Sequence, residues 1–249
     1  TKIIGGNMKI LKEEYKNWDI YYLEVDKKLL NLGENLADGK KLNITNIYKE
    51  SQRNYVAKIK FNNKYYVLKS PRNEFRIPQR RFFTRFKDGE VLTTLKNITN
   101  LKKRGLDIFA TPFLAMVKRE KGVIIESYII LEYIDGKDAG EKKNEAIELV
   151  KKMHSFKVYH GDFNPGNFVF DGDKLKVIDT QAKKYWFGEY RAHYDMLTMK
   201  IDSYREMKYP YKKDFWFYLA LFMKRLKRLR SIEKIKKWKK KKRDQGWKI

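Results

Sequence analysis

Residues 160–179, HGDFNPGNFVFDGDKLKVID, contain a His-x-Asp pair, an Asn five residues after that Asp, and a second Asp at the end. In the pattern H-x-D-x-x-x-x-N, the Asp accepts the proton of an attacking hydroxyl and the Asn oxygen holds a metal ion. A later Asp holds the metal that bridges the phosphates. These positions are Asp162, Asn167 and Asp179, which predicts a phosphoryl-transfer site. The plainer alternative is a polar loop with Asp179 as a cap at a strand end.

A hairpin is predicted between the two metal-binding positions. The dipeptide Asp171-Gly172 is a two-residue turn signal, and residues 174–178 return as a strand that ends on Asp179. The hairpin would bring Asn167 and Asp179 side by side, as shared ligation requires. Mg²⁺ prefers oxygen ligands and usually takes one or two protein carboxylates together with phosphates and water, so we expect Mg²⁺ here.

The composition indicates a globular chain with a large excess of positive charge. The 249 residues are 42% hydrophobic, with no cysteine and three histidines, which excludes disulfides and argues against zinc. The longest apolar run, Phe215 to Met223, is far shorter than the ~18 residues of a spanning helix, so we expect a cytoplasmic protein. The net charge of +26 predicts attraction to polyanions, which are nucleic acid, an anionic membrane surface or an anionic substrate.

Residues 41–70 predict an antiparallel meander of three strands, with a turn at Asn62-Asn63 between the last two. Lys69 lies on one face of the last strand, which is otherwise apolar. Because burying an ammonium group is costly unless it meets an anion, we expect Lys69 to contact a phosphate and a carboxylate from a following helix. A solvent-exposed strand lysine is the alternative.

Glu90 is the predicted carboxylate partner of Lys69. The apolar periodicity of residues 78–104 indicates a helix that is interrupted at Asp88-Gly89, and Glu90 opens its second part. Glu74 is too close to Lys69 in sequence to reach back to it from a separate helix.

Two further strands are predicted at residues 113–117 and 123–133, and the second runs into Asp135-Gly136. Backbone groups near Glu132 and Tyr133 could then read the edge of a flat adenine.

The rest of the chain is predicted to be mainly helical, beginning with residues 141–156. His154, near the apolar stripe of that helix, is interpreted as a packed, hydrogen-bonded side chain. His160 is expected to support the loop that carries Asp162, and His193 has no predicted role.

The order of these elements resembles the protein-kinase-like fold over about residues 41–200. More narrowly, three stretches are similar to the bacterial lipopolysaccharide core heptose kinases, within them the heptose(II) kinase branch. They are YYVLKSPRNEFRIPQRRFFTRFKDGEVLTTLKNI at 65–98, HGDFNPGNFVF at 160–170 and KVIDTQAKKYWFGEYRAHYDMLTMKID at 176–202. The resemblance implies an α+β fold with a small antiparallel β-sheet lobe at residues 1–134 and a mainly helical lobe at 135–249.

The resemblance also implies transfer of the γ-phosphoryl group of ATP, with Mg²⁺, to a heptose hydroxyl of the lipopolysaccharide inner core. Asp162 would be the base, and Asn167 and Asp179 would bind Mg²⁺. Lys69 would reach the α- and β-phosphates, and Glu90 would fix Lys69. From the helix after the hairpin, residue 195, an Asp, would support the catalytic loop.

The loop KESQRN at residues 49–54 departs from the general kinase pattern because it has no glycine. Kinases usually cover the phosphates with a Gly-rich turn whose bare backbone approaches closely. Ser51, Gln52 or Arg53 would have to take this role.

The segment after Asp179 departs in two further ways. Asp179 is followed by Thr180-Gln181 instead of Phe-Gly, which argues against a regulated in/out switch. Only 15 residues lie between Asp179 and Asp195, too few for the long activation segment of a protein kinase. A small or glycolipid hydroxyl is therefore the better acceptor.

The C-terminal residues 208–249 hold 17 Lys and Arg against 3 Asp and Glu. Apolar residues recur there at three- and four-residue steps, which predicts a helix. Up to Met223 it is apolar nearly all round and is expected to pack on the larger lobe. Beyond that, a narrow apolar stripe between lysines suits the anionic surface of the inner membrane, although the stripe could instead complete the core. Peripheral attachment on the cytoplasmic face would follow.

Two other functions are compatible with the sequence. One is a non-catalytic kinase-fold protein that binds nucleic acid or a membrane surface, which the charge and the missing glycines favour. We expect no nucleic-acid binding, because Lys69, Asp162, Asn167 and Asp179 occur together. The other is a small-molecule phosphotransferase of the antibiotic-kinase type, which would not need the basic tail.

Overall fold

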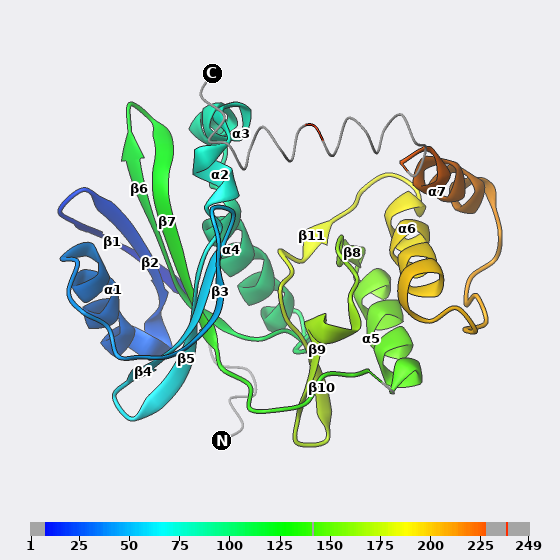
Figure 1. Ribbon diagram of the computed structural model, residues 1–249, viewed down its shortest axis with the longest axis horizontal. Coiled ribbons are helices and arrows are strands. Elements are labelled where there is room, and N and C mark those ends of the chain that lie inside the picture. The colour runs from blue at the N-terminus through cyan, green and yellow to red at the C-terminus, as the bar shows by residue number, and fades with distance from the viewer. Residues whose placement is uncertain (1–7, 141, 228–237, 239–249) are drawn as a thin grey trace. The chain divides into compact units, whose positions relative to one another are not determined.

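The computed structural model describes residues 8–140, 142–227 and 238 (Figure 1). These residues form two compact units that divide after Tyr133, one residue before the predicted boundary. Each unit is described by itself. Most of the predicted basic helix beyond residue 226 lies outside the described residues. Within the described part of the chain, no helix has the length and apolar character needed to cross a membrane.

A seven-stranded antiparallel sheet with strand order β1-β2-β6-β7-β5-β4-β3 forms the first unit. The strands are β1 (Ile10–Tyr15), β2 (Trp18–Leu23), β3 (Ile44–Glu50), β4 (Tyr55–Phe61), β5 (Lys64–Ser70), β6 (Pro112–Glu120) and β7 (Val123–Glu132). Strands β3 to β5 are the predicted meander. Asn62 and Asn63 both have positive φ, as a two-residue hairpin turn requires. The hairpin β1–β2 is not among the predicted strands.

Two helices cover opposite faces of the sheet. The helical elements of this unit are η1 (Glu24–Leu29), α1 (Leu30–Ala37), α2 (Asn73–Arg76), α3 (Pro78–Phe83), η2 (Thr84–Phe86) and α4 (Glu90–Lys103). Leu114 and Met116 of β6 pack in the cluster that contains α1, whereas Ala115 and Val117 pack in the cluster that contains α4. Since successive side chains of a strand point to opposite faces, α1 and α4 lie on opposite sides of the sheet (Figure 1).

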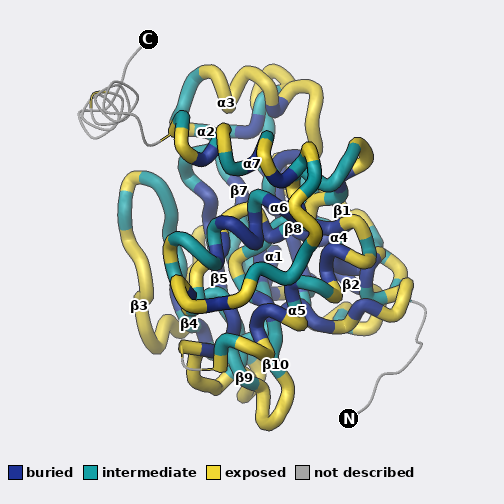
Figure 2. Tube along the Cα trace, turned by 90° about the vertical axis from the view of Figure 1, so that its right-hand side faces the viewer, coloured by how far each residue is buried: buried dark blue, intermediate teal, exposed yellow. Residues whose placement is uncertain are grey.

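The predicted interruption of the helix at Asp88-Gly89 is confirmed, and α4 begins at Glu90. Gly89 has a φ of +83°, and a Cβ there would lie 2.4 Å from Cδ1 of Ile124. Only glycine fits this turn. Most of α3 and all of β3 are exposed (Figure 2).

The second unit is mainly helical. Its elements are α5 (Lys143–Ser155), β8 (Val158–Tyr159), η3 (Pro165–Asn167), β9 (Phe168–Asp171), β10 (Lys174–Val177), β11 (Lys183–Lys184), α6 (Tyr190–Thr198), η4 (Met199–Ser203) and α7 (Phe215–Leu226). The predicted hairpin is β9–β10. Asp171 pairs with Lys174, so the turn is Gly172-Asp173, one residue later than predicted.

Helix α7 packs on α6 of the second unit, as expected, but through one face only. Phe217 and Ala220 are buried in a cluster with Leu197 of α6. Phe215 and Phe222, on the other side of the helix, are exposed. The helix therefore has an apolar face toward solvent as well as one toward the core.

Candidate active site

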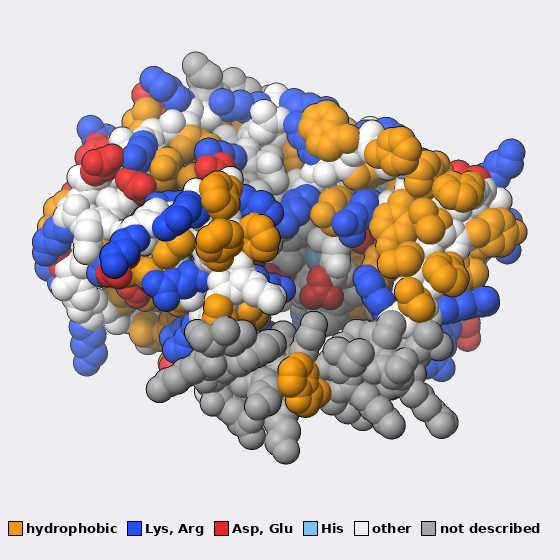
Figure 3. Space-filling view, turned by 90° about the horizontal axis from the view of Figure 1, so that it is seen from above, with side chains coloured by type: hydrophobic (Ala, Val, Ile, Leu, Met, Phe, Trp, Pro, Cys, Tyr) orange, Lys and Arg blue, Asp and Glu red, His pale blue; other side chains and the backbone are white. Residues whose placement is uncertain are grey.

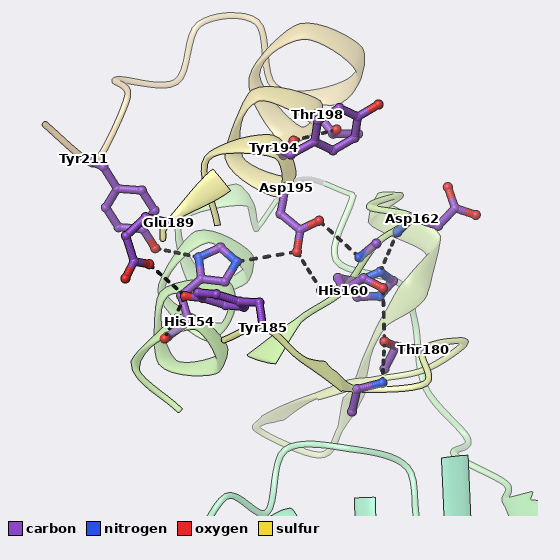
Figure 4. A network of polar contacts seen from close by, with 12 residues as sticks. His154, His160, Asp162, Thr180, Tyr185, Glu189, Tyr194, Asp195, Thr198 and Tyr211 are labelled. Carbon is purple, nitrogen blue, oxygen red and sulfur yellow. Dashed lines mark hydrogen bonds and ion pairs between the residues drawn. The ribbon is translucent and has the colours of Figure 1, made fainter. Parts of the chain in front are cut away.

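The backbone of the loop from His160 to Asn167 is held by Asp195 of α6 (Figure 4). Asp195 Oδ2 accepts a hydrogen bond from the backbone N–H of His160 at 2.6 Å, and Oδ1 accepts one from Gly161 at 3.1 Å. The Asp195 side chain is buried. Charge-assisted hydrogen bonds to backbone N–H groups are strong, so the expected support of the loop by Asp195 is confirmed.

Histidines surround this carboxylate in structural roles. His154 is buried, with Nδ1 2.7 Å from the Tyr211 hydroxyl and Nε2 3.4 Å from Asp195 Oδ2. His160 stacks on Phe168 and accepts a hydrogen bond at Nδ1 from the backbone N–H of Asp162 at 3.3 Å. Burial lowers the pKa of His160, so the ring is neutral when it accepts this bond. The structural interpretations of His154 and His160 are confirmed.

His193, which had no predicted role, fixes the start of α7. Its Nδ1 lies 2.7 Å from the Tyr209 hydroxyl and its Nε2 lies 3.1 Å from Oδ1 of Asp214. Asp214 also caps α7 by accepting from the backbone N–H of Phe217 at 3.0 Å.

Asp162 presents its carboxylate to solvent. Its side chain points away from the Asp195 network, while its backbone N–H is held by His160 (Figure 4). The Asn167 side chain donates Nδ2–H to the backbone carbonyl of Asp162 at 3.0 Å. Because the amide nitrogen is used in this way, the amide oxygen of Asn167 is the atom left to meet a cation.

The hairpin places Asp179 beside Asn167 along the backbone. The N–H of Ile178 donates to the carbonyl of Asn167 at 2.8 Å, and Asp179 is the next residue. Asp179 is exposed and has a φ of +53°, a strained conformation of the kind found at functional sites. An amide oxygen and a carboxylate on neighbouring stretches of backbone are suitable ligands for Mg²⁺.

No cluster of three or more His, Cys, Asp or Glu in the described ranges could hold a metal alone. A metal at Asn167 and Asp179 would therefore draw its remaining ligands from phosphate and water, which is usual for Mg²⁺. The donor set fits this ion.

Thr180 secures the backbone after Asp179. Its hydroxyl donates to the carbonyl of His160 at 3.2 Å and accepts from the N–H of Ala182 at 3.1 Å. Three residues after Thr180, β11 begins and pairs with β8, the strand that precedes the loop from His160 to Asn167. Where kinases have Phe-Gly, this chain has a hydroxyl bound to the loop itself.

The first unit places Lys69 and α4 on one face of the sheet. Lys69 is opposite Ile129 of β7, and Ile129 packs in the α4 cluster. Since directly opposite residues of neighbouring strands share a face, Lys69 lies on the side of α4, whose first residue is Glu90. The pairing of Lys69 with Glu90 stays a prediction.

Glu74 of α2 is a residue that sequence reasoning missed. Its Oε1 accepts a hydrogen bond from the backbone N–H of Glu90 at 2.7 Å. This contact stabilises the start of α4, where the first N–H groups have no partner within the helix. Burial raises the pKa of Glu74 to about 7, and the negative charge of Glu90 adds to this shift. No local signal indicates this contact, because Glu74 and Glu90 are 16 positions apart in the sequence.

In the segment predicted to bind adenine, some of the polar groups already form hydrogen bonds within the first unit. The backbone N–H of Glu132 donates to the carbonyl of Thr111 at 2.8 Å, and its carboxylate accepts from the N–H of Thr111 at 2.9 Å. This N–H is therefore not available to a ligand. The ammonium group of Lys58 lies over the Tyr133 ring, 3.8 Å from the ring centroid, in a cation–π contact.

The glycine-free loop is organised by Ser51. Its hydroxyl donates to the carbonyl of Asn54 at 3.1 Å and accepts from the N–H groups of Arg53 and Asn54. Arg72 donates to the Ser51 carbonyl at 3.1 Å. Of the three residues suggested for phosphate closure, Ser51 is thus used in the turn itself.

Comparison with known proteins gives a family match and a set of structural neighbours. The model of the family described as Lipopolysaccharide core biosynthesis protein (WaaY) matches residues 9–239. No curated protein matches the chain. The kinase domain of Mycobacterium tuberculosis PknI is 15% identical, with 71% of this chain and 82% of that chain covered and a TM-score of 0.40. A point mutant of that domain is 16% identical, with 71% and 81% covered and the same TM-score of 0.40.

Proposed function

The chain belongs to the lipopolysaccharide core biosynthesis protein (WaaY) family, and from this premise we propose that it is a kinase of the lipopolysaccharide core. It transfers the γ-phosphoryl group of ATP to a heptose hydroxyl of the inner core, with Mg²⁺ as its metal ion. One observation carries the proposal. The exposed carboxylate of Asp162 sits on a loop fixed by the buried Asp195, beside Asn167 and Asp179.

Asp162 is the proposed base that accepts the proton of the acceptor hydroxyl. Its carboxylate faces solvent while its backbone is held by His160, so the group is positioned without being buried. Such fixed positioning contributes to phosphoryl transfer because little reorganisation is needed during the reaction. Asn167 and Asp179 are the proposed Mg²⁺ ligands. The bound ion supplies neutralisation of the phosphate charge.

In the first unit, we assign Lys69 to the α- and β-phosphates of ATP and Glu90 to the fixing of Lys69. Their common location on the α4 side of the sheet supports this assignment. The backbone N–H of Glu132 is already bonded to Thr111, so we propose that Tyr133 and the backbone groups that follow Glu132 contact the edge of the adenine.

The proposed acceptor is an anionic glycolipid, and it defines where the protein works. We propose a cytoplasmic protein attached peripherally to the cytoplasmic face of the inner membrane through the basic tail at residues 208–249. About 1 kcal/mol per nearby basic residue is the usual attraction to an anionic leaflet.

The test is the Asp162→Ala variant. Transfer of phosphate from ATP to purified core glycolipid should fall by about 10²–10⁴-fold, the usual contribution of a positioned base, while nucleotide binding measured by calorimetry persists. Asp173→Ala, at the exposed tip of the same hairpin, is the matched control and should behave as wild type.

Two outcomes would contradict the proposal. Undiminished turnover by Asp162→Ala would remove the base assignment. Transfer to small antibiotic acceptors, with none to glycolipid that carries inner-core heptose, would favour the antibiotic-kinase alternative.

A further inference from the structure

The solvent-facing side of α7 is lined with large aromatic rings. Phe215, Tyr218 and Phe222 are 69%, 59% and 60% exposed. They follow one another at three- and four-residue steps, so they share one face of the helix. The opposite face holds the buried Phe217 and Ala220. Core packing of α7 therefore leaves three aromatic rings in water.

A second segment extends this surface. Trp186 and Phe187, in the connection between β11 and α6, are 88% and 82% exposed. The Phe187 ring meets the ring of Trp216 edge-on, with 5.3 Å between centroids. A Cβ on Gly188 would lie 2.3 Å from the Trp216 ring, so the connection is packed directly against the start of α7. Trp186, Phe187, Phe215, Tyr218 and Phe222 thus form one surface, which we call the aromatic face.

Exposure of this much apolar surface is unusual for a soluble protein and marks an interaction site. Two of the rings are held by Trp216, because Phe187 contacts its ring at 5.3 Å and Phe215 contacts it at 5.2 Å. A partner could therefore bind the aromatic face with little ordering cost.

Basic side chains border the aromatic face. Lys184 lies over the Trp186 ring at 5.8 Å from its centroid. The chain segments that carry the rings also contain five other exposed basic residues, namely Lys183, Arg191, Lys212, Lys213 and Arg225, whereas Lys224 is buried. In Figure 3, hydrophobic side chains gather at the right with lysine and arginine side chains around them.

Two carboxylates lie near this surface. Glu189 forms an ion pair with Lys157. Asp214 caps α7 and lies 3.1 Å from Nε2 of His193, but burial lowers the pKa of His193, so this contact does not cancel the charge of Asp214. The exposed lysine and arginine side chains outnumber these two carboxylates, so the surface is positive overall.

We propose that the aromatic face docks on the surface of an anionic phospholipid bilayer. Trp and Tyr are the residues that favour the membrane–water interface, and a basic border adds attraction to anionic lipids. A second copy of this chain fits less well, because two chains of net charge +26 repel each other. The choice of a membrane rests on the proposed function, in which the acceptor is a glycolipid, although docking itself requires no phosphoryl transfer.

The experiment measures binding of the full chain to sedimenting vesicles, of phosphatidylcholine alone or mixed with phosphatidylglycerol. Wild type should bind the mixed vesicles and bind phosphatidylcholine weakly. Trp186→Ser with Phe187→Ser, and separately Phe215→Ser with Phe222→Ser, should each weaken binding by about tenfold or more, because each pair removes two interfacial anchors. Tyr48→Ser changes an exposed aromatic residue of β3, 51% exposed and outside the aromatic face, and as the control it should bind as wild type.

A second readout keeps docking separate from catalysis. Vesicles with brominated acyl chains should quench the tryptophan fluorescence of wild type more strongly than that of Trp186→Phe. Both double variants should phosphorylate detergent-dispersed core glycolipid at the wild-type rate, since neither changes a proposed active-site residue. If wild type does not phosphorylate the core glycolipid, the proposed function is contradicted. The vesicle measurement would still test docking, because it does not depend on turnover.

Four results would overturn the docking proposal. Two of them are that wild type pellets with neither type of vesicle and that both double variants pellet as wild type does. Concentration-dependent self-association, or salt-sensitive binding of an oligonucleotide, that is lost in both double variants would assign the aromatic face to a second copy or to nucleic acid instead.

Discussion

At the scale of single residues, Thr180 has the clearest testable consequence. Its hydroxyl joins the backbone after Asp179 to the carbonyl of His160. Thr180→Val keeps the shape of the side chain but leaves the Ala182 N–H without this partner, at a cost of about 1–3 kcal/mol. We expect a lower midpoint of thermal unfolding together with a lower kcat, because Asp179 loses its fixed position.

Thr180→Ser is the matched control, because it retains the hydroxyl and should restore most of both quantities. Calorimetry and steady-state kinetics at saturating ATP would measure them. A Thr180→Val enzyme with a wild-type kcat would show that this contact does not position Asp179.

The local structure of the loop from His160 to Asn167 and of the hairpin after it was predictable because the residues involved are close in sequence. Asp162, Asn167 and the hairpin lie within one continuous stretch, and a turn signal fixes their order. Thr180 and Glu74 were not recognised, because the partner of each is a backbone group that only tertiary packing brings near. The pKa of Glu74 in particular depends on burial, which no local pattern records.

At the scale of elements, the alternation of apolar and polar residues and the turn residues between them predicted β3 to β7 and the hairpin β9–β10. The turn of β9–β10 was predicted one residue too early. The hairpin β1–β2 was not predicted, because β1 is a partly exposed edge strand with charged residues at its centre. Trp18, Ile20 and Tyr22 of β2 do alternate into the core, and this was the available signal. Helix α7 was expected to pack on the larger lobe and does so, but its nearly uniform apolar composition does not reveal which face stays in water.

Glu74 makes the stability of α4 depend on pH. In the folded state its pKa is raised from 4.5 to about 7, whereas the unfolded chain releases this proton at the ordinary value. The folded state thus holds more protons between these limits, and the free energy of unfolding falls as pH rises through them. The slope is at most about 1.4 kcal/mol per pH unit.

Glu74→Gln keeps an oxygen for the Glu90 N–H but carries no charge, so it removes this penalty. Relative to wild type, it should be more stable by about 1–3 kcal/mol at about pH 8 and nearly equal at about pH 4, below the unfolded-state pKa, by urea unfolding. Titrating histidines affect both proteins alike and cancel in the difference. Glu120→Gln, an exposed control, should show no such change. A stability difference for Glu74→Gln that is independent of pH would contradict the raised pKa.

At the scale of the whole molecule, the chain passes from the sheet unit to the helical unit through residues 133–139. Inside the second unit, this connection is bonded to the hairpin β9–β10. Asp138 forms a bridge with Val169, and the N–H of Ala139 donates to the carbonyl of Phe168 at 2.8 Å. The connection is therefore part of the fold that positions the residue before β9, Asn167.

Gly136 is the residue of this connection that tolerates least change. A Cβ there would lie 1.7 Å from the backbone oxygen of Phe170, so Gly136→Ala must push the connection away from β9. Forcing extra atoms into packed structure usually costs about 1–3 kcal/mol. Hydrogen exchange should show faster exchange in β9 and β10 with unchanged protection in β4 to β7.

Gly140→Ala is the matched control for Gly136→Ala, because its Cβ would approach only the end of the Asp138 side chain, at 3.1 Å, and that side chain can move. If Gly136→Ala left exchange in the hairpin unchanged, the connection would be a passive link. If exchange rose equally in both units, the two would unfold as one cooperative body. An increase confined to the hairpin β9–β10 would mean that the connection pairs with this hairpin as the chain enters the second unit. The same backbone contacts would then stabilise both the connection and the proposed metal ligands.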